Sequence, residues 1–163
     1  MAEASVRIVP SQRHAALLAE QVARLRQEGP VILVSFMRTC DHWRKELGAG
    51  EDLFFVDVTG HGPPGIAFGV DVHYVDSPVK LELVALVLDR VVRRLGGGQI
   101  VIDDLGTACM VNNVGATVEF AHLLINRSRQ QGCPLHLFLS DAASPALADA
   151  LRGLAVDSTE TLA

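Results

Sequence analysis

The chain has 163 residues and carries 14 Lys and Arg against 19 Asp and Glu, which gives a formal net charge of −5. This length suits one domain, so we expect a single domain over residues 1–163. The acidic balance lacks the basic footprint of nucleic-acid-binding proteins, and we expect no nucleic-acid partner. Hydrophobic residues make up 49% of the chain and charged residues 20%, which excludes an intrinsically disordered protein.

The first half of the chain is predicted to form two helices and three strands. In Ser11–Glu28 apolar residues recur every three or four positions, which predicts an amphipathic helix capped by Ser11 and ended by Gly29 and Pro30. Short continuous apolar runs are typical of strands covered on both faces. Such runs occur at Val31–Phe36, Leu53–Asp57 and Asp71–Val75. A short helix is predicted at Asp41–Leu47, and Gly60–Gly69 is predicted to be an irregular surface loop.

The second half continues the alternation of helix and strand. Ser77 as cap and Pro78 as first helical residue predict a helix that runs to Leu95, where three glycines stop it. The remaining expected elements are strand Ile100–Asp104, helix Val114–Gln131, strand Leu135–Ser140, helix Ser144–Leu151 and edge strand Val156–Leu162. This alternation predicts a three-layer α/β fold, a mostly parallel sheet with helices on both faces.

The sequence contains no signal for a membrane or for secretion. Residues 1–10 lack the apolar run of a signal peptide, and no stretch approaches the roughly 18 apolar residues of a membrane span. The three cysteines, Cys40, Cys109 and Cys133, are odd in number and lack C-x-x-C spacing, which indicates reduced thiols. We therefore expect a cytoplasmic protein with no membrane partner.

Polar residues follow the predicted strands at the positions where parallel α/β sheets bind ligands. The ligand-binding candidates at these strand ends and on the adjoining loop are Ser35, Arg38, Asp57, His61, Asp103 and Asp104. Arg38 is suited to bind a carboxylate or phosphate, and an aspartate with His61 is suited to move a proton. These residues define a possible small-molecule site or active site.

The order and pattern of these segments resemble the RecA/KaiC-type ATPases. Gly98–Leu105, an apolar strand that ends in aspartate, looks like their Walker B strand, and Gly115–Gln131 followed by Cys133–Leu139 is similar to the helix and strand after it. Ala15–Gln27 and Gly29–Phe36 resemble the helix after the P-loop and the next strand. The likeness covers about Val6 to Ala163 and implies a RecA/KaiC-like P-loop NTPase topology.

The catalytic parts of that family do not match. A P-loop needs glycines to cradle phosphates, a lysine and a hydroxyl, but the segment in its place, Val6–His14, contains neither glycine nor lysine. The two lysines, Lys45 and Lys80, lie elsewhere, and Met37 and Arg38 stand where active relatives carry a catalytic glutamate. We therefore expect a degenerate domain without the P-loop, with no ATP hydrolysis, no cofactor and no enzyme activity.

A metal site and a nucleophilic cysteine are two other chemistries that these residue types allow, and each has a simpler interpretation. The pair Asp103 and Asp104 would suit a cation, but we favour Asp103 accepting backbone amides and Asp104 being solvated. Cys40, His42 and His61 lack the spacing of zinc ligands, so no metal is expected, and Cys40 as a nucleophile is disfavoured.

Because we expect no P-loop, no metal site and no nucleophilic cysteine, partner binding is the function that we favour. Trp43 and Arg44 are candidate partner contacts, with simple packing as the equal alternative for Trp43. The predicted helix Val79–Leu95 is apolar around most of its circumference and needs cover from a protein partner or a second copy of the chain. We expect a non-catalytic regulatory or sensory protein-interaction module; the alternative is a small-molecule-binding protein or enzyme that uses the strand-end crevice.

Overall fold

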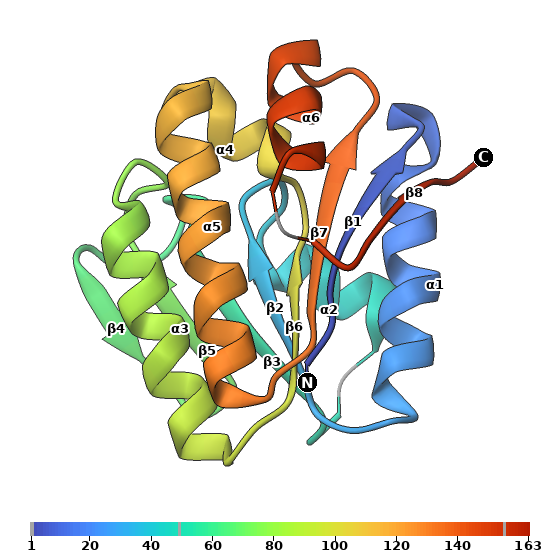
Figure 1. The fold of residues 1–163 in the computed structure, drawn as a ribbon. Helices are drawn as coiled ribbons and strands as arrows, with labels where there is room; N and C mark the ends of the chain where they lie inside the picture. The colour runs from blue at the N-terminus through green and yellow to red at the C-terminus, as the bar shows by residue number, and fades with distance from the viewer. Residues whose placement is uncertain (1, 49, 155) are drawn as a thin grey trace.

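The computed structural model describes residues 2–48, 50–154 and 156–163, and eight strands in this part of the chain form one sheet (Figure 1). The strands are β1 (Ala4–Val9), β2 (Val31–Ser35), β3 (Leu53–Asp57), β4 (Ile66–Phe68), β5 (Val72–Val75), β6 (Gln99–Ile102), β7 (Leu135–Ser140) and β8 (Ser158–Thr161). Their order is β4-β5-β3-β2-β6-β7-β1-β8, and every neighbouring pair is parallel except β4 and β5.

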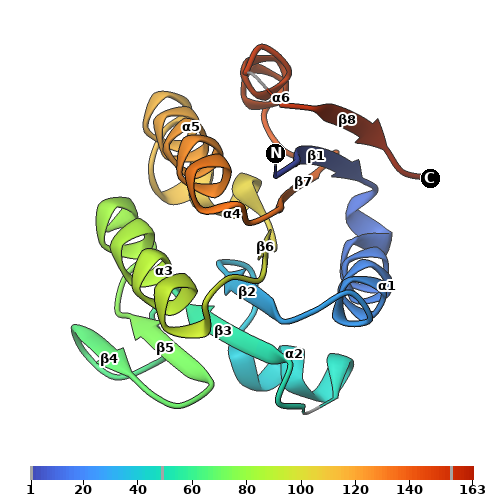
Figure 2. The ribbon, with the colours of Figure 1, turned by 60° about the horizontal axis from the view of Figure 1, so that its bottom comes forward.

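Helices cover both faces of the sheet. They are α1 (His14–Arg26), α2 (Cys40–Leu47), α3 (Leu81–Leu95), α4 (Leu105–Val111), α5 (Val114–Gln131) and α6 (Pro145–Arg152), with a 3-10 turn, η1 (Ser11–Arg13), before α1. Figure 2 shows α3, α5 and α6 on one face and α1 and α2 on the other. Among the described helices, none has the length and apolar character needed to cross a membrane.

The two helical layers explain why β2 is apolar from Val31 to Val34. Along β2, Ile32 and Val34 belong to the core under α3 and α5, whereas Val31 and Leu33 belong to the core under α1 and α2. Successive side chains of a strand point to opposite faces, so a sheet covered on both faces needs apolar residues at every position. The predicted three-layer α/β arrangement and its mostly parallel sheet are therefore confirmed at this level.

Most of the predicted elements are present, and two predicted caps are wrong. Ser11 lies in the 3-10 turn, and α1 starts at His14 without a side-chain cap. Ser77 and Pro78 form a turn, in which the Ser77 hydroxyl accepts from the backbone N–H of Val79, and α3 begins only at Leu81. The predicted stops hold, because Gly96 and Gly132 adopt left-handed φ values of 71° and 68° at the ends of α3 and α5.

Three elements were not predicted. The strand β1 contains the polar residues Ser5 and Arg7, which interrupt its apolar run, and both are buried. The strand β4 lies in the stretch Gly60–Gly69 that was predicted to be irregular, and it pairs antiparallel with β5. The helix α4 is only seven residues long and begins at a cap on Asp104.

Candidate functional site

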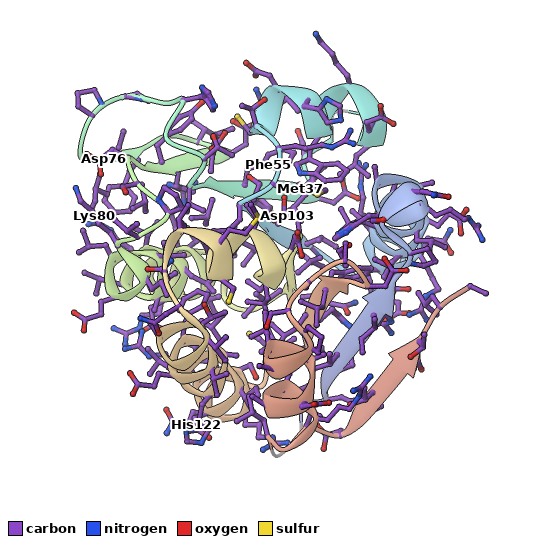
Figure 3. The ribbon with its side chains drawn as sticks, turned by 90° about the horizontal axis from the view of Figure 1, so that it is seen from above. Met37, Phe55, Asp76, Lys80, Asp103 and His122 are labelled. Atoms are coloured by element: carbon purple, nitrogen blue, oxygen red, sulfur yellow. The ribbon has the colours of Figure 1, made fainter. Side chains whose placement is uncertain are left out.

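The carboxyl ends of β2, β3, β6 and β7 meet at one edge of the sheet, which Figure 3 views from above. Ser35 and Asp57 are the last residues of β2 and β3, and Asp103 directly follows β6. Figure 3 places Asp103 beside Met37 near the middle of this edge, whereas Asp76 and Lys80 lie together at its margin. The predicted strand-end residues are thus on one side of the molecule.

Asp103 is completely enclosed, with 0% of its surface exposed. Its Oδ1 accepts a hydrogen bond from the backbone N–H of Phe36 at 2.7 Å. Its Oδ2 accepts from the backbone N–H of Met37 at 3.1 Å and from the indole Nε1 of Trp43 at 3.2 Å. The carboxyl group therefore ties the end of β6 to the β2–α2 connection and to α2.

The protonation of Asp103 is set by opposing effects. Burial raises the pKa of Asp103 to about 7, and the neighbouring Asp104 carboxylate acts in the same direction. The three N–H donors act against this rise, because they stabilise the charged form. Such a pKa suits an acid–base group, but every donor that Asp103 receives comes from inside the protein, so the carboxyl group offers no free position to a substrate.

Asp104 caps helix α4. Its Oδ1 accepts from the backbone N–H of Gly106 at 2.9 Å and of Ser140 at 3.4 Å, and its Oδ2 accepts from the Thr107 hydroxyl at 2.8 Å. We predicted that Asp104 is solvated, but the structure buries it. Asp103 therefore makes the amide contacts of our favoured interpretation, whereas the expectation for Asp104 is wrong, because the cap of α4 encloses its carboxylate.

Ser35 and Asp57 are also engaged internally. The Ser35 hydroxyl donates to the Val56 carbonyl at 3.5 Å. Asp57 Oδ2 accepts from the backbone N–H of Cys40 at 2.8 Å, and its Oδ1 accepts from the Thr59 hydroxyl at 2.7 Å. These contacts hold the start of α2 against the end of β3.

Arg38, Arg44 and His61 do not converge with the buried aspartates, whereas Trp43 contacts Asp103 through its indole N–H. The Arg38 guanidinium lies 5.8 Å from the centre of the Trp43 ring and contacts His42. Trp43 is fully buried, so the structure gives its ring a packing role and leaves no indole surface for a partner in this conformation. Arg44 forms an ion pair with Asp71 at 2.7 Å, and His61 lies exposed in the loop after β3.

One cavity of about 400 Å³ opens at this edge of the sheet, between α4 and the β7–α6 connection. Its lining residues are Asp104, Gly106, Cys109, Met110, Ser140, Ala142, Ala143 and Ser144. Among the predicted ligand-binding residues, Asp104 is the one that this lining includes. Ser140 follows a predicted strand, a position that the sequence marks for ligand binding, whereas Cys109 and Ser144 carry no such signal and were not expected.

The described residues provide no cluster of metal ligands, and the Cys40 thiol is not activated. Within residues 2–48, 50–154 and 156–163, no group of three or more His, Cys, Asp and Glu side chains is placed to hold a metal ion. Burial raises the pKa of the Cys40 thiol, which disfavours the thiolate that a nucleophilic cysteine requires.

The segment Pro10–Arg13, where the resemblance to ATPases would require a P-loop, is a tight turn after β1. The backbone N–H of Arg13 donates to the Pro10 carbonyl at 2.9 Å, and that of Ser11 donates to Asp141 at 2.9 Å. A phosphate cradle needs several free amides that point at one centre. These two amides are already used within the chain.

No family model matches the sequence, and no curated protein is significantly similar to it.

Proposed function

We propose that this chain is a non-catalytic regulatory or sensory protein-interaction module of RecA/KaiC-like topology, and that it associates with a second copy of itself through α3. The observation that carries the proposal is the uncovered outer face of this helix. Leu86 on α3 is 57% exposed, and Val79 in the turn before the helix is 53% exposed.

Most of α3 is covered within the chain, and a groove remains beside it. The residues of its buried face are Leu81, Val84, Ala85, Val87, Leu88, Val91 and Val92. The groove, about 430 Å³ in volume, runs between α3 and α5 and has Leu83, Phe120 and Leu123 among its apolar lining residues. Glu82 and Glu119 also line it. The uncovered surface is therefore narrower than we predicted and is centred on one side of α3.

The charges of α3 make its outer face complementary to itself. Glu82 lies in the first turn and Arg93 in the last turn, with exposed Leu86 between them. In a twofold antiparallel pairing of α3 with its copy, Glu82 of each chain lies near the basic end of the other helix, and the two Leu86 side chains meet near the axis. Such a contact covers Leu86 and pairs opposite charges.

A charge exchange tests this pairing. We expect the wild-type chain to be a dimer in light-scattering measurements at about 500 µM and low salt, where a Kd of about 50 µM gives mostly dimer. The variants Leu86→Glu, Glu82→Arg and Arg93→Glu should each be monomeric, because each places like charges or an unpaired charge in the contact. The double variant Glu82→Arg/Arg93→Glu should recover the dimer.

The control for Leu86→Glu is Val70→Glu, which places the same charge at an exposed apolar residue on the β4–β5 hairpin. It should leave the dimer intact. A wild-type chain that is monomeric at this concentration, or a double variant no better than the singles, would contradict the proposed pairing.

The RecA/KaiC-like part of the proposal is supported by the order of elements. The unit β1–η1–α1 stands where the strand, P-loop and helix of such ATPases would be, and β7 alone separates β1 from β6, whose end carries Asp103 and Asp104. The absence of a lysine and of glycines in this turn argues against phosphate chemistry.

We expect purified protein with Mg²⁺ and ATP to release phosphate no faster than the variant Asp103→Asn does. Asp103 ends the segment that resembles Walker B, so any residual Walker-type mechanism would need it at the metal, and its oxygens already accept the N–H groups of Phe36, Met37 and Trp43. Turnover in the wild-type protein that disappears in the variant would refute the non-catalytic assignment.

A second candidate function is small-molecule binding at the strand ends. One observation favours it, the cavity of about 400 Å³ between α4 and the β7–α6 connection. Its size is within the range of ligand pockets, and it lies where parallel sheets bind their ligands. A ligand that raises the melting temperature of the wild-type protein but not of Ser140→Leu would support this alternative.

A further inference from the structure

A second pocket lies on the other side of α3 and contains a histidine with no hydrogen-bonding partner. His73 on β5 is only 1% exposed, and neither its Nδ1 nor its Nε2 has a partner among the described residues. A neutral imidazole carries one donor and one acceptor, and leaving both unpaired away from water disfavours folding. Such a group calls for a partner that the chain itself does not provide.

The pocket has a volume of about 80 Å³ and is lined by Phe68, His73, Arg90, Val91 and Arg94. Phe68 on β4 is the register partner of His73, so both side chains lie on the α3 face of the hairpin, with ring centres 5.6 Å apart. The Arg90 guanidinium lies 4.2 Å from the centre of the Phe68 ring. One side of the pocket is therefore the β4–β5 hairpin and the other is the last turns of α3.

The two arginines give this pocket an excess of positive charge. Among the described residues, neither Arg90 nor Arg94 forms an ion pair with a carboxylate. Arg94 donates to the carbonyls of Gly69 and Val70, which leaves three of its five N–H donors. The carboxylate that acts most on His73, Asp71, is engaged by Arg44 at 2.7 Å.

His73 faces these arginines as a neutral donor. Burial lowers the pKa of His73, and the charges of Arg94 and Arg90 lower it further. Its ring is then uncharged near neutral pH, with one N–H to donate. Two guanidinium groups and one neutral N–H in a small pocket form a donor set that matches a negatively charged oxygen group.

We infer that the pocket between α3 and the β4–β5 hairpin binds a compact oxyanion, a phosphate, sulfate or carboxylate group, through Arg90, Arg94 and His73. The volume is too small for a nucleotide but sufficient for such a group. The site is separate from the α3–α5 groove and from the strand-end cavity, and none of their lining residues belongs to it.

The test measures the melting temperature against phosphate, sulfate and acetate, with sodium chloride adjusted to keep the ionic strength constant. An anion that binds the folded state should raise the melting temperature along a saturating curve. Arg90→Gln and Arg94→Gln should each weaken the binding at least about 10-fold. Arg152→Gln, which removes an equal charge from the exposed face of α6, should bind as the wild type does.

Two further readouts separate binding from folding. His73→Phe removes the unpaired nitrogens, so the free protein should melt at the same or a higher temperature while its response to the anion is lost. In wild type, the ring nitrogen resonances of His73 should shift with saturating anion.

A response to acetate alone assigns the site to carboxylates, and a response to phosphate or sulfate assigns it to tetrahedral oxyanions. Equal responses in Arg90→Gln and wild type, or no saturable response to any of the three, would overturn the inference.

Discussion

Replacing Asp103 with alanine is expected to lower the free energy of unfolding by about 3–5 kcal/mol at pH 7. The substitution leaves three buried donors without an acceptor, the N–H groups of Phe36 and Met37 and the indole of Trp43. Each buried donor that loses its partner costs about 1–3 kcal/mol, and relaxation of the β2–α2 connection recovers part of the sum. Urea denaturation followed by circular dichroism measures the difference.

The matched control is Asp76→Ala, which removes a carboxylate from the margin of the same sheet edge. Asp76 accepts from the backbone N–H of Gly65 and pairs with Lys80, and both contacts are exposed. Exposed pairs of this kind contribute about 0–1 kcal/mol. If Asp103→Ala destabilises the protein no more than Asp76→Ala does, Asp103 is not the tie between β6 and α2 that its contacts indicate.

The layered fold was predictable because its cause is local. A strand buried on both faces favours apolar residues at every position, and this is visible in the run Val31–Val34 of β2. The strand β1 escaped prediction because its face under α1 carries Ser5 and Arg7, whose buried positions depend on distant partners. Arg7 donates to His136, which lies 129 residues further along the chain.

The sequence predicts where the candidate site lies in the sheet, but it does not predict the hydrogen-bond partners of its residues. That Asp103 and Asp57 lie at the carboxyl edge follows from the strand pattern alone. The engagement of Asp103 by Trp43, 60 residues away, depends on how α2 packs on the sheet, and no spacing in the sequence encodes that distance. The oxyanion pocket was missed for the same reason, because Arg90 meets His73 only through the packing of α3 on β5.

His136 is a second buried titratable group, and its effect on the pH dependence of stability opposes that of Asp103. The Nδ1 of His136 lies 2.9 Å from a guanidinium nitrogen of Arg7, which only donates, so Nδ1 accepts and the ring proton is on Nε2, facing Gln99 at 3.1 Å. Burial lowers the pKa of His136 to about 4, and the charges of Arg7 and Arg24 act in the same direction. This histidine is therefore neutral in the folded protein above that pH.

Between pH 4 and 6.5, Asp103 and His136 change the free energy of unfolding in opposite directions as pH rises. The folded state holds an extra proton on Asp103, whose pKa is raised from 3.8 to about 7, so its stabilisation is full at low pH and is lost as pH rises through 7. The unfolded state takes up an extra proton at His136, whose pKa falls from 6.5 to about 4, so its stabilisation is full above pH 6.5 and is lost as pH falls. Each contributes a slope of up to about 1.4 kcal/mol per pH unit, and the two slopes oppose each other.

A variant that lacks one of these two groups should therefore show the pH dependence of stability that the other group causes. Relative to wild type, Asp103→Asn should gain stability with rising pH, by up to about 3 kcal/mol between pH 4 and 6.5, because the opposing slope of Asp103 is gone. His136→Gln should change in the reverse direction by a similar amount over the same range. Urea denaturation of the three proteins at half-unit pH intervals measures these differences, and groups common to all three, such as His73, cancel in the comparison. Parallel curves for wild type and Asp103→Asn would show that Asp103 keeps an ordinary pKa, in which case its three N–H donors outweigh burial and the carboxylate is charged throughout this range.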